Sequence, residues 1–262
     1  MNVGSGLSEA EAPAVAVVTG AARGIGAAVA RRFAREALWK VRGFDLLDAE
    51  TGSGGAEGEY TVERCDVALE EDVSAAVRRL DQDFGRIDVL VNVAGIVLIK
   101  PVTEATWDEF DRLIRVNLGG MWLWCKHVIP VMQRQNHGVI VNVASVSGHV
   151  GQVNHALYGA SKGAILSFTR ALAWEVAQFN IRVVSVSPGS VDTEMLRSDI
   201  RSESAQLGKP YDALRREREG EQALGRWAGA DEIAEPVFFL ASKGASFITG
   251  ADLLVDGGWT AR

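Results

Sequence analysis

Short apolar runs alternate with longer amphipathic segments along most of the chain. The apolar runs predict strands over residues 14–19, 40–45, 59–66, 87–92, 138–145, 181–187 and 251–256. The segments between them predict helices over residues 24–37, 70–83, 104–134 (as one helix or two), 157–178 and 231–241. Runs of valine and isoleucine are typical of strands covered on both faces. The pattern therefore predicts an α/β fold, a doubly wound parallel sheet of about seven strands with helices on both faces.

Two segments depart from this rhythm. Residues 48–59 are rich in glycine and acidic side chains and predict a surface loop. Residues 194–224 are long, polar and charged. They fit a solvated helix face with alternating charges, and their place after the sixth strand also allows a lid over a site. No change of composition divides the chain, so we expect a flexible N-terminal tail (residues 1–13) and one domain (residues 14–262).

Composition and charge narrow the classes of function. The chain has 262 residues and a net charge of −7, which disfavours a nucleic-acid or anionic-membrane partner. No apolar run approaches the length of a membrane span, and the acidic start lacks the pattern of a signal peptide. Cys65 and Cys125 lie far apart and in no metal-ligand spacing, so we predict reduced thiols and no metal site. These features favour a cytoplasmic protein that acts on small molecules.

The sequence "VVTGAARGIGAAVA" runs from the first predicted strand into a helix. Gly20 permits a sharp turn, Gly24 permits close approach of the backbone to a pyrophosphate, and Gly26 permits tight packing of the helix on the strand. The free N–H groups at the start of the helix favour phosphate. Glycines also mark ordinary turns, but the strand–loop–helix context predicts a dinucleotide site.

Asp45 ends the second predicted strand, about 20 residues beyond this loop. A carboxylate at that place accepts hydrogen bonds from both ribose hydroxyls of NAD and repels the 2′-phosphate of NADP. Arg23 and Arg42 lie nearby in the sequence and could soften this preference. Asp45 could instead only form a turn at the end of the strand. We predict NAD as the cofactor, with NADP disfavoured.

Seven motifs in order now identify a resemblance. They are "TGAARGIG" (19–26), "CDV" (65–67), "NVAG" (92–95), "VN" (116–117), "VASVSG" (143–148), "YGASK" (158–162) and "SPGSVDT" (187–193). Together they resemble the short-chain dehydrogenase/reductase family over nearly the whole chain, which implies a single Rossmann-type domain. Val93 is a mild variation on the family pattern. Relatives tend to have a glycine near Leu38, so we expect an altered end to the first helix.

The resemblance implies four catalytic residues. Tyr158 corresponds to the general acid/base, and Lys162, one helical turn away, tunes its pKa and binds the nicotinamide ribose. A free phenol has a pKa of about 10, so lowering it to about 7 means stabilising phenolate by about 4 kcal/mol. Lys162 and an oxidised nicotinamide ring can supply this stabilisation. Ser145 would hold the substrate oxygen, and Asn117 would anchor a water that links Lys162 to solvent.

The resemblance also implies the cofactor contacts. Asp66 and Val67 would contact the adenine. Asn92, Ala94 and Gly95 would line the region of the adenosine ribose. Thr193 and the turn at 188–189 would face the nicotinamide carboxamide. Asp66 could instead cap the next helix, and Asn92 could satisfy backbone at its strand end. The full predicted set is Gly20, Arg23, Gly24, Ile25, Gly26, Asp45, Asp66, Val67, Asn92, Ala94, Gly95, Tyr158, Lys162, Pro188, Gly189, Val191 and Thr193.

The substrate is less defined by the sequence. Some motifs resemble the branch that oxidises 2,3-dihydro-2,3-dihydroxybenzoate, which favours a cyclic alcohol or dihydrodiol. A general secondary-alcohol/ketone activity, a 3-oxoacyl thioester reductase and, remotely, a non-catalytic dinucleotide-binding regulator remain alternatives. For an acidic substrate, Arg197 or Arg201 could pair with the carboxylate.

Several side chains are candidates for the substrate pocket. His149 and His155 are either substrate contacts or polar loop residues, and Gln152, Met195 and Leu196 are similar candidates. The family often pairs subunits through the helix at 157–178 and through its last strand. The resemblance therefore also implies a homotetramer.

Overall fold

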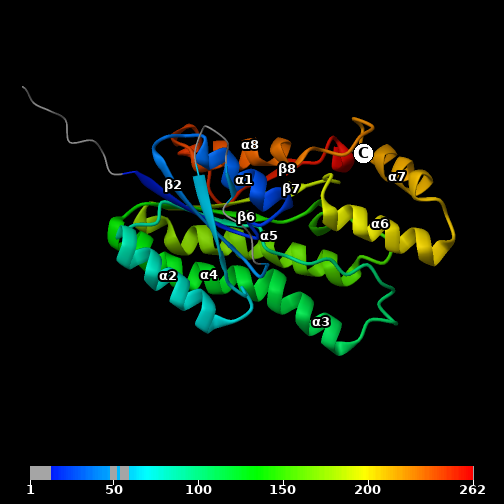
Figure 1. Cartoon of the computed structure of the whole chain (residues 1–262), viewed down its shortest axis with the longest axis horizontal. Coiled ribbons are helices and arrows are strands. Elements are labelled where there is room, and N and C mark those ends of the chain that lie inside the picture. Colours follow the sequence, from blue (N-terminus) through cyan, green and yellow to red (C-terminus); the bar gives the residue numbers. More distant parts are fainter. Residues whose placement is uncertain (1–12, 48–51, 54–58, 262) are drawn as a thin grey trace, which may run out of the picture.

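An eight-stranded sheet forms the centre of the computed structural model, which describes residues 13–47, 52–53 and 59–261 (Figure 1). The sheet order is β3-β4-β2-β1-β5-β6-β7-β8, and every neighbouring pair is parallel except β3 with β4. The strands are β1 (Ala14–Thr19), β2 (Trp39–Asp45), β3 (Gly52–Ser53), β4 (Glu59–Arg64), β5 (Val89–Asn92), β6 (Gly138–Val143), β7 (Ile181–Pro188) and β8 (Asp252–Val255).

Helices cover both faces of this sheet, with α1 and α8 on one face and α2, α4 and α5 on the other (Figure 1). None of the helices in the described residues is long and apolar enough to cross a membrane. The α-helices are α1 (Gly24–Ala34), α2 (Glu70–Phe84), α3 (Trp107–Ile114), α4 (Met121–Gln135), α5 (Ala156–Val176), α6 (Glu194–Leu207), α7 (Tyr211–Gly220) and α8 (Ala230–Ala241).

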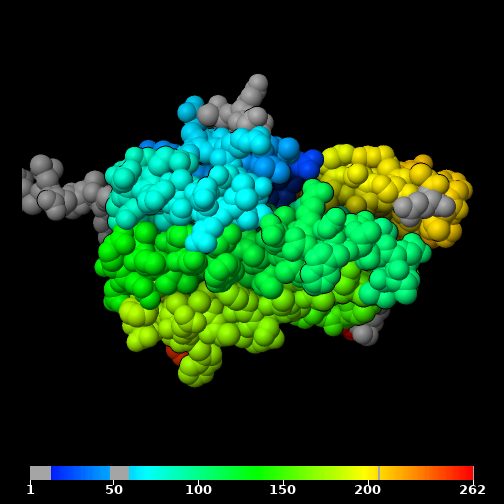
Figure 2. Space-filling model, turned by 90° about the horizontal axis from the view of Figure 1, so that it is seen from below, coloured from blue at the N-terminus to red at the C-terminus, as the bar shows by residue number. Residues whose placement is uncertain are grey.

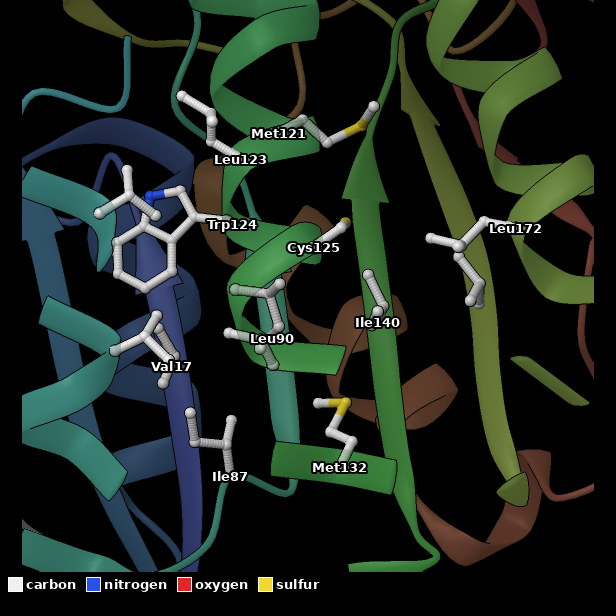
Figure 3. Close-up of a cluster of buried hydrophobic side chains, with 14 of the residues drawn as sticks. Val17, Ile87, Leu90, Met121, Leu123, Trp124, Cys125, Met132, Ile140 and Leu172 are labelled. Carbon is white, nitrogen blue, oxygen red and sulfur yellow. The ribbon is translucent and has the colours of Figure 1, made fainter. Parts of the chain in front are cut away.

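Alternation along each strand builds two separate cores. Val15 and Val17 of β1 pack with α2 and α4, whereas Ala16 and Val18 pack with α1 and α8. Successive side chains of a strand point to opposite faces, so a strand that is apolar throughout is buried on both sides. Figure 3 shows the first of these cores, where Trp124 of α4 lies over the sheet. The two cores fix the sheet, and with it the edge at which the strands end.

The architecture confirms the predicted parallel sheet with helices on both faces, and it differs in detail. β3 adds a short antiparallel edge strand within the segment predicted as a loop; the rest of that segment up to Gly58 lies outside the described residues. The segment 104–134 forms two helices, joined by a π-helical stretch, η2 (Arg115–Gly120). Of the predicted tail, only Pro13 is described.

The first helix ends earlier than predicted. α1 stops at Ala34, three residues before the expected end, and Leu38 is exposed beyond it. Its C-cap, Arg35, keeps a right-handed helical backbone. Without a glycine near position 38 the chain leaves the helix without the left-handed turn that glycine favours.

The segment 194–224 folds as two helices, α6 and α7. Ile200 of α6 and Leu214 of α7 form a small buried cluster with Trp227 of the segment that follows α7. Figure 2 shows the yellow atoms of this pair at one end of the molecule, next to the green atoms of the α3 region. The predicted charged helix faces are therefore present, and the pair stands beside the edge at which the parallel strands end (Figure 1).

Asp88 ties the starts of the central strands together. Its buried carboxylate accepts hydrogen bonds from the backbone N–H of Val15 at 2.8 Å and from Arg86 at 2.6 and 2.8 Å. Its backbone N–H donates to Val15, and its carbonyl accepts from Val139. One residue thus joins the beginnings of β1, β5 and β6.

Substitution of Asp88 by alanine should destabilise the fold. It leaves the buried Val15 N–H without its acceptor, which costs about 2–3 kcal/mol. We expect the midpoint of thermal unfolding to fall by about 5–10 °C, measured by circular dichroism. Asp83→Ala, which removes an exposed carboxylate of α2, is the control and should leave the midpoint nearly unchanged. Equal midpoints for the two variants would contradict this role of Asp88.

Candidate active site

A cavity of about 770 Å³ opens at the edge where the parallel strands end. β1 lies between β2 and β5, so the chain leaves β1 toward one side and returns on the other. Such a switch point leaves a crevice between the loops that follow the strands. One end of the cavity is lined by the residues after β1, β2, β4 and β5, and the other by those after β6 and β7 together with α6.

The glycine-rich loop forms the floor of the first end. Gly20 has a φ of +67°, and a Cβ there would lie 3.0 Å from the backbone of Ala94. A Cβ on Gly26 would lie 2.0 Å from the carbonyl oxygen of Gly20, so the helix can start this close to the strand only with glycine. Both positions require glycine for packing, as predicted.

The start of α1 is suited to an anion. Its N-cap, Arg23, makes no side-chain cap, and the first turn contains no acidic residue. By contrast, α3 is closed by a capping box between Thr106 and Glu109. The N–H groups that begin α1 therefore remain available toward the cavity that Gly24 and Ile25 line, where they and the helix dipole favour phosphate.

Asp45 stands at the cavity wall as β2 ends. Its two carboxylate oxygens accept hydrogen bonds from the backbone N–H of Ala22 and of Leu47, both at 3.0 Å. The predicted turn-forming role is thus present, and each oxygen retains a further acceptor position. Arg42 does not line the cavity, because its guanidinium lies over the ring of Phe84, 4.9 Å from the ring centroid.

Most other predicted cofactor contacts line the same end or the middle of the cavity. Asp66 accepts a hydrogen bond from the backbone N–H of Ala68 at 2.9 Å and does not cap α2, whose N-cap is Leu69. Thr193 caps α6 through a long bond (3.4 Å), and its methyl group faces Gly24. The predicted residues that line the cavity are Gly20, Arg23, Gly24, Ile25, Gly26, Asp45, Asp66, Val67, Ala94, Gly95, Tyr158, Lys162, Pro188, Gly189, Val191 and Thr193.

Asn92 is placed differently from the rest of that set. Its side chain is buried below the cavity and does not line it. Its amide donates to Asn142 of β6 at 2.9 Å, and Asn142 donates to Thr169 of α5 at 2.9 Å. The structure thus gives Asn92 a role in joining β5 and β6 to α5, and its backbone neighbours Ala94 and Gly95 reach the cavity instead.

Ser145, Tyr158 and Lys162 meet at the second end of the cavity. Tyr158 and Lys162 lie one turn apart on α5, and Ser145 follows β6. The buried ammonium group of Lys162 donates to the carbonyl of Val143 at 2.9 Å and lies 5.8 Å from the centre of the Tyr158 ring. Burial lowers the pKa of Lys162 to about 8, so the group remains mostly charged at neutral pH.

The phenol of Tyr158 is held neutral by its surroundings. Burial raises its pKa to about 12, against a lowering by the hydroxyl of Ser145, while the charge of Asp199 raises it further. The residues of the chain by themselves therefore do not bring the pKa of this phenol near 7. Additional positive charge beside the phenol is required, and the sequence predicts that an oxidised nicotinamide ring supplies it.

Ser145 is fixed by its own loop. It is the N-cap of a short 3-10 helix, η3 (Val146–Gly148), and its Oγ accepts from the N–H of Ser147 at 3.2 Å. The same Oγ donates to the hydroxyl of Ser147 at 3.3 Å, which in turn donates to Gln152. Because a hydroxyl rotates freely, Ser145 can turn its proton toward a substrate oxygen at little cost.

Asn117 lies on the π-helical stretch η2, a type of bulge often found at functional sites. Its Oδ1 accepts from the N–H of Ile96 at 2.8 Å, and its amide donates to the carbonyl of Ile96 at 2.9 Å and to Ser161 at 3.1 Å. The side chain is buried and does not line the cavity. It holds the loop after β5 against α5; the predicted water link stays a prediction.

Of the two candidate histidines, one lines the cavity and the other does not. His155 lines the cavity, and the centre of its ring lies 6.2 Å from that of Tyr158. Burial lowers the pKa of His155; its Nδ1 lies 2.7 Å from the carbonyl of Val153, to which it donates, so Nε2 is an acceptor in the neutral ring. His149 does not line the cavity and instead contacts Asp252 at 2.9 Å and Ser187 at 3.1 Å.

α6 and α7 contribute charged residues that were not among the predicted candidates. Asp199 and Glu203 of α6 and Arg218 of α7 line the cavity. The spacing of four residues places Asp199 and Glu203 on one face of α6 with the predicted Met195, and this spacing was the available signal. The predicted candidates Gln152, Met195 and Leu196 also line the cavity.

Arg197 and Arg201 occupy another face of α6. They pair with Asp192 at 2.7 Å and with Glu194, and neither lines the cavity. In this arrangement both guanidinium groups are exposed and already paired. The structure therefore does not bring them to the place where a substrate carboxylate would lie beside Tyr158.

The donor set and the shape of the cavity fit a nicotinamide dinucleotide. An uncapped helix start and close-packed glycines lie at one end, a strand-end carboxylate beside them, and Lys162 and Tyr158 at the other end. This order matches a pyrophosphate, an adenosine ribose and a nicotinamide ribose in turn.

Comparison with known proteins agrees with this geometry. Residues 20–260 match the family model described as enoyl-(acyl carrier protein) reductase. The cis-4-hydroxycyclohexanecarboxylate dehydrogenase of Sinomonas cyclohexanicum is 40% identical, over 97% of this chain and 100% of the relative.

Two solved structures share the fold. The ligand-free aldohexose dehydrogenase of Thermoplasma acidophilum has a TM-score of 0.86 and 34% identity, covering 95% of each chain. A variant of actinorhodin polyketide ketoreductase, solved with NADPH, has a TM-score of 0.87 and 31% identity over 95% of this chain and 98% of the other. With the ordered motifs and the cavity at the ends of the strands, these matches show that the chain belongs to the short-chain dehydrogenase/reductase family.

Proposed function

We propose that this protein is an NAD-dependent dehydrogenase that oxidises the secondary hydroxyl group of a small cyclic alcohol to a ketone. The observation that carries the proposal is the meeting of Ser145, Tyr158 and Lys162 in the cavity that also contains the start of α1 and Asp45. A proton acceptor, a hydroxyl that orients the substrate and a dinucleotide cradle thus share one space. The relative named cis-4-hydroxycyclohexanecarboxylate dehydrogenase supports the cyclic substrate, though not its charge.

The bound cofactor would supply the hydride acceptor and, in its oxidised form, a positive charge beside Tyr158. Ser145 donates a hydrogen bond to the substrate oxygen and positions the carbinol carbon. Tyr158 accepts the proton of that hydroxyl as the alcohol becomes a ketone, and it returns the proton when the reaction runs in the direction of reduction. The cation of Lys162 stabilises the phenolate, since opposite charge favours the ionised form.

Three features support NAD over NADP. Asp45 places a negative charge at the end of β2, where the adenosine ribose of a dinucleotide lies. Arg42, which could have offset this charge, lies over Phe84. The arginines that do line the cavity outside α7, Arg23, Arg112 and Arg115, are exposed to solvent, where their attraction for a phosphate is screened.

We also propose that the protein forms a homotetramer in the cytoplasm. The exposed Trp174 of α5 and Leu254 of β8 lie on the elements that the family resemblance implies for subunit contacts. The segment 194–224 would act as the lid that excludes water from the reacting groups.

Tyr158→Phe should abolish turnover. The substitution removes the only phenol oxygen in the catalytic set while keeping the ring, so we expect kcat to fall at least about 1,000-fold. Dissociation constants for NADH, from fluorescence titration, should stay within about threefold. Tyr211→Phe deletes a hydroxyl from α7 outside the cavity lining and should retain full activity. More than a few per cent of wild-type turnover in Tyr158→Phe would refute the assignment.

Asp45→Asn should reverse or erase the cofactor preference. The amide keeps an acceptor for the backbone N–H of Ala22 but removes the charge that repels a 2′-phosphate. We expect kcat/KM for NAD to fall and that for NADP to rise, so that their ratio drops by about 10–100-fold. Steady-state kinetics with both cofactors would measure this, with Asp83→Asn as the control. An unchanged ratio would show that Asp45 does not select the cofactor.

The rate of alcohol oxidation should rise with pH. The reactive form of Tyr158 is the phenolate, and burial raises the pKa of this phenol to about 12. Below the operating pKa each unit of pH multiplies the phenolate fraction by about ten, so log kcat/KM for oxidation should climb toward a plateau at alkaline pH. Lys162→Met removes the stabilising cation and should move the inflection to higher pH. A profile that falls between pH 6 and pH 9 would contradict the proposed base.

A further inference from the structure

The substrate end of the cavity contains a carboxylate that the proposed mechanism does not use. Asp199 lies in the middle of α6, half-buried, and lines the cavity together with Tyr158 and His155. Among the described residues none donates a hydrogen bond to it or forms an ion pair with it. The other carboxylates of α6 and of the segment between β7 and α6 are Glu194, Glu203 and Asp192, and each has an arginine partner.

The cation nearest in charge effect, Arg218, already forms ion pairs with other carboxylates. Arg218 of α7 pairs with Glu203 at 3.0 Å and with Glu221 at 3.1 Å. Its charge acts on Asp199 only at longer range. Asp199 and Glu203 line the cavity with Arg218, whose charge Glu221 also shares, so with Asp199 ionised this part of the cavity wall is negative overall.

The remaining polar groups around Asp199 do not neutralise it. His155 is neutral, because burial lowers its pKa, and its Nδ1 proton goes to Val153. Gln152 uses its carbonyl oxygen to accept from Ser147. The rest of this wall is apolar, from Met195, Leu196 and Ile200. A hydrogen-bond acceptor thus stands in a mainly apolar part of the cavity, near enough to Tyr158 for its charge to raise the pKa of the phenol.

We propose that Asp199 is a specificity-determining residue that accepts a hydrogen bond from a second hydroxyl group of the substrate, so that the enzyme prefers neutral diols or polyols. The inference rests on the proposed function, because it needs the first hydroxyl between Ser145 and Tyr158. It narrows the cyclic alcohols to those with a second hydroxyl within reach of α6.

The physical reason is the cost of leaving a desolvated carboxylate without a donor. When the substrate displaces solvent from Asp199, the second hydroxyl of a diol donates the hydrogen bond that water donated before. A mono-ol places only hydrocarbon beside the carboxylate. A substrate carboxylate would meet the negative wall and be repelled. Burial raises the pKa of Asp199 to about 6, so near pH 7 the side chain is mostly ionised and acts only as an acceptor.

The test compares kcat/KM for three neutral diols (cyclohexane-1,2-, 1,3- and 1,4-diol) with that for cyclohexanol. The wild type should prefer the best of the diols by about tenfold or more. Asp199→Leu removes the acceptor and should lower this preference by about 10–100-fold, chiefly through a higher KM for the diol. Its kcat/KM for cyclohexanol should rise, because the charge that opposes phenolate formation at Tyr158 is removed and a leucine suits an apolar substrate.

Asp199→Asn separates the hydrogen bond from the charge. Its amide oxygen keeps an acceptor, so the preference for diols should fall by less than in Asp199→Leu. With cis-4-hydroxycyclohexanecarboxylate as an anionic probe, kcat/KM should rise several-fold in Asp199→Asn because the repulsion is removed. Asp212→Leu, which removes an exposed carboxylate of the neighbouring α7, is the matched control and should change neither ratio.

The outcomes distinguish this inference from the proposed function. If the wild type oxidises cyclohexanol as well as every diol, or if Asp199→Leu keeps the preference, Asp199 does not select a second hydroxyl and the proposed function stands. A wild-type preference for the anionic probe would likewise overturn the inference and assign the wall to Arg218. If no alcohol is oxidised with NAD or NADP, the proposed function fails and the inference with it. Should Asp199→Leu not fold, Asp199→Asn tests the inference instead, through its ratio of kcat/KM for the diol to that for cyclohexanol and through its kcat/KM for the anionic probe.

Discussion

The hydrogen bond from the buried ammonium group of Lys162 to the carbonyl of Val143 is the interaction on which the site depends. It attaches α5 to the last residue of β6, two positions before Ser145. A buried cation without partners would be very costly, so this contact also sets how deep the helix can sit. Tyr158, one turn earlier on the same helix, is thereby held at the wall from which Ser145 projects.

A second polar layer lies below this contact and keeps the strand ends in register. Asn92 and Asn142 face each other across β5 and β6, and Asn142 reaches Thr169 on α5. Asn117 in turn joins the loop after β5 to Ser161 on the same helix. Buried amides of this kind are favourable only when their partners are in place, so they penalise any shift of α5 along the sheet. The two residues of the predicted catalytic and cofactor-binding sets that lie outside the cavity, Asn92 and Asn117, belong to this layer.

The sequence predicted the sheet well because apolar strands covered on both faces leave a strong pattern. It also singled out Gly20, Asp45, Tyr158 and Lys162, because each occupies a motif whose spacing has a geometric reason, and all four line one cavity in the structure. It could not predict the early end of α1 or the π-helical stretch before α4, because both depend on packing rather than on local pattern. The inward turn of Asn92 has the same origin, since residue type alone does not say which side of a strand end an amide will face.

The face that α6 presents to the cavity shows the limit of charge patterns in a sequence. The segment 194–224 has the alternating charges of a solvated helix, and most of them are paired with arginines at the surface. Only the spacing of four residues, from Met195 to Asp199 and Glu203, distinguishes the face of α6 that lines the cavity from its solvated faces. An unpaired acid is unremarkable in solvent, but beside Tyr158 its charge opposes the formation of phenolate. A carboxylate that works against the base of the reaction is best explained by binding, because a substrate hydroxyl that donates to it partly offsets its charge and so eases the ionisation of Tyr158.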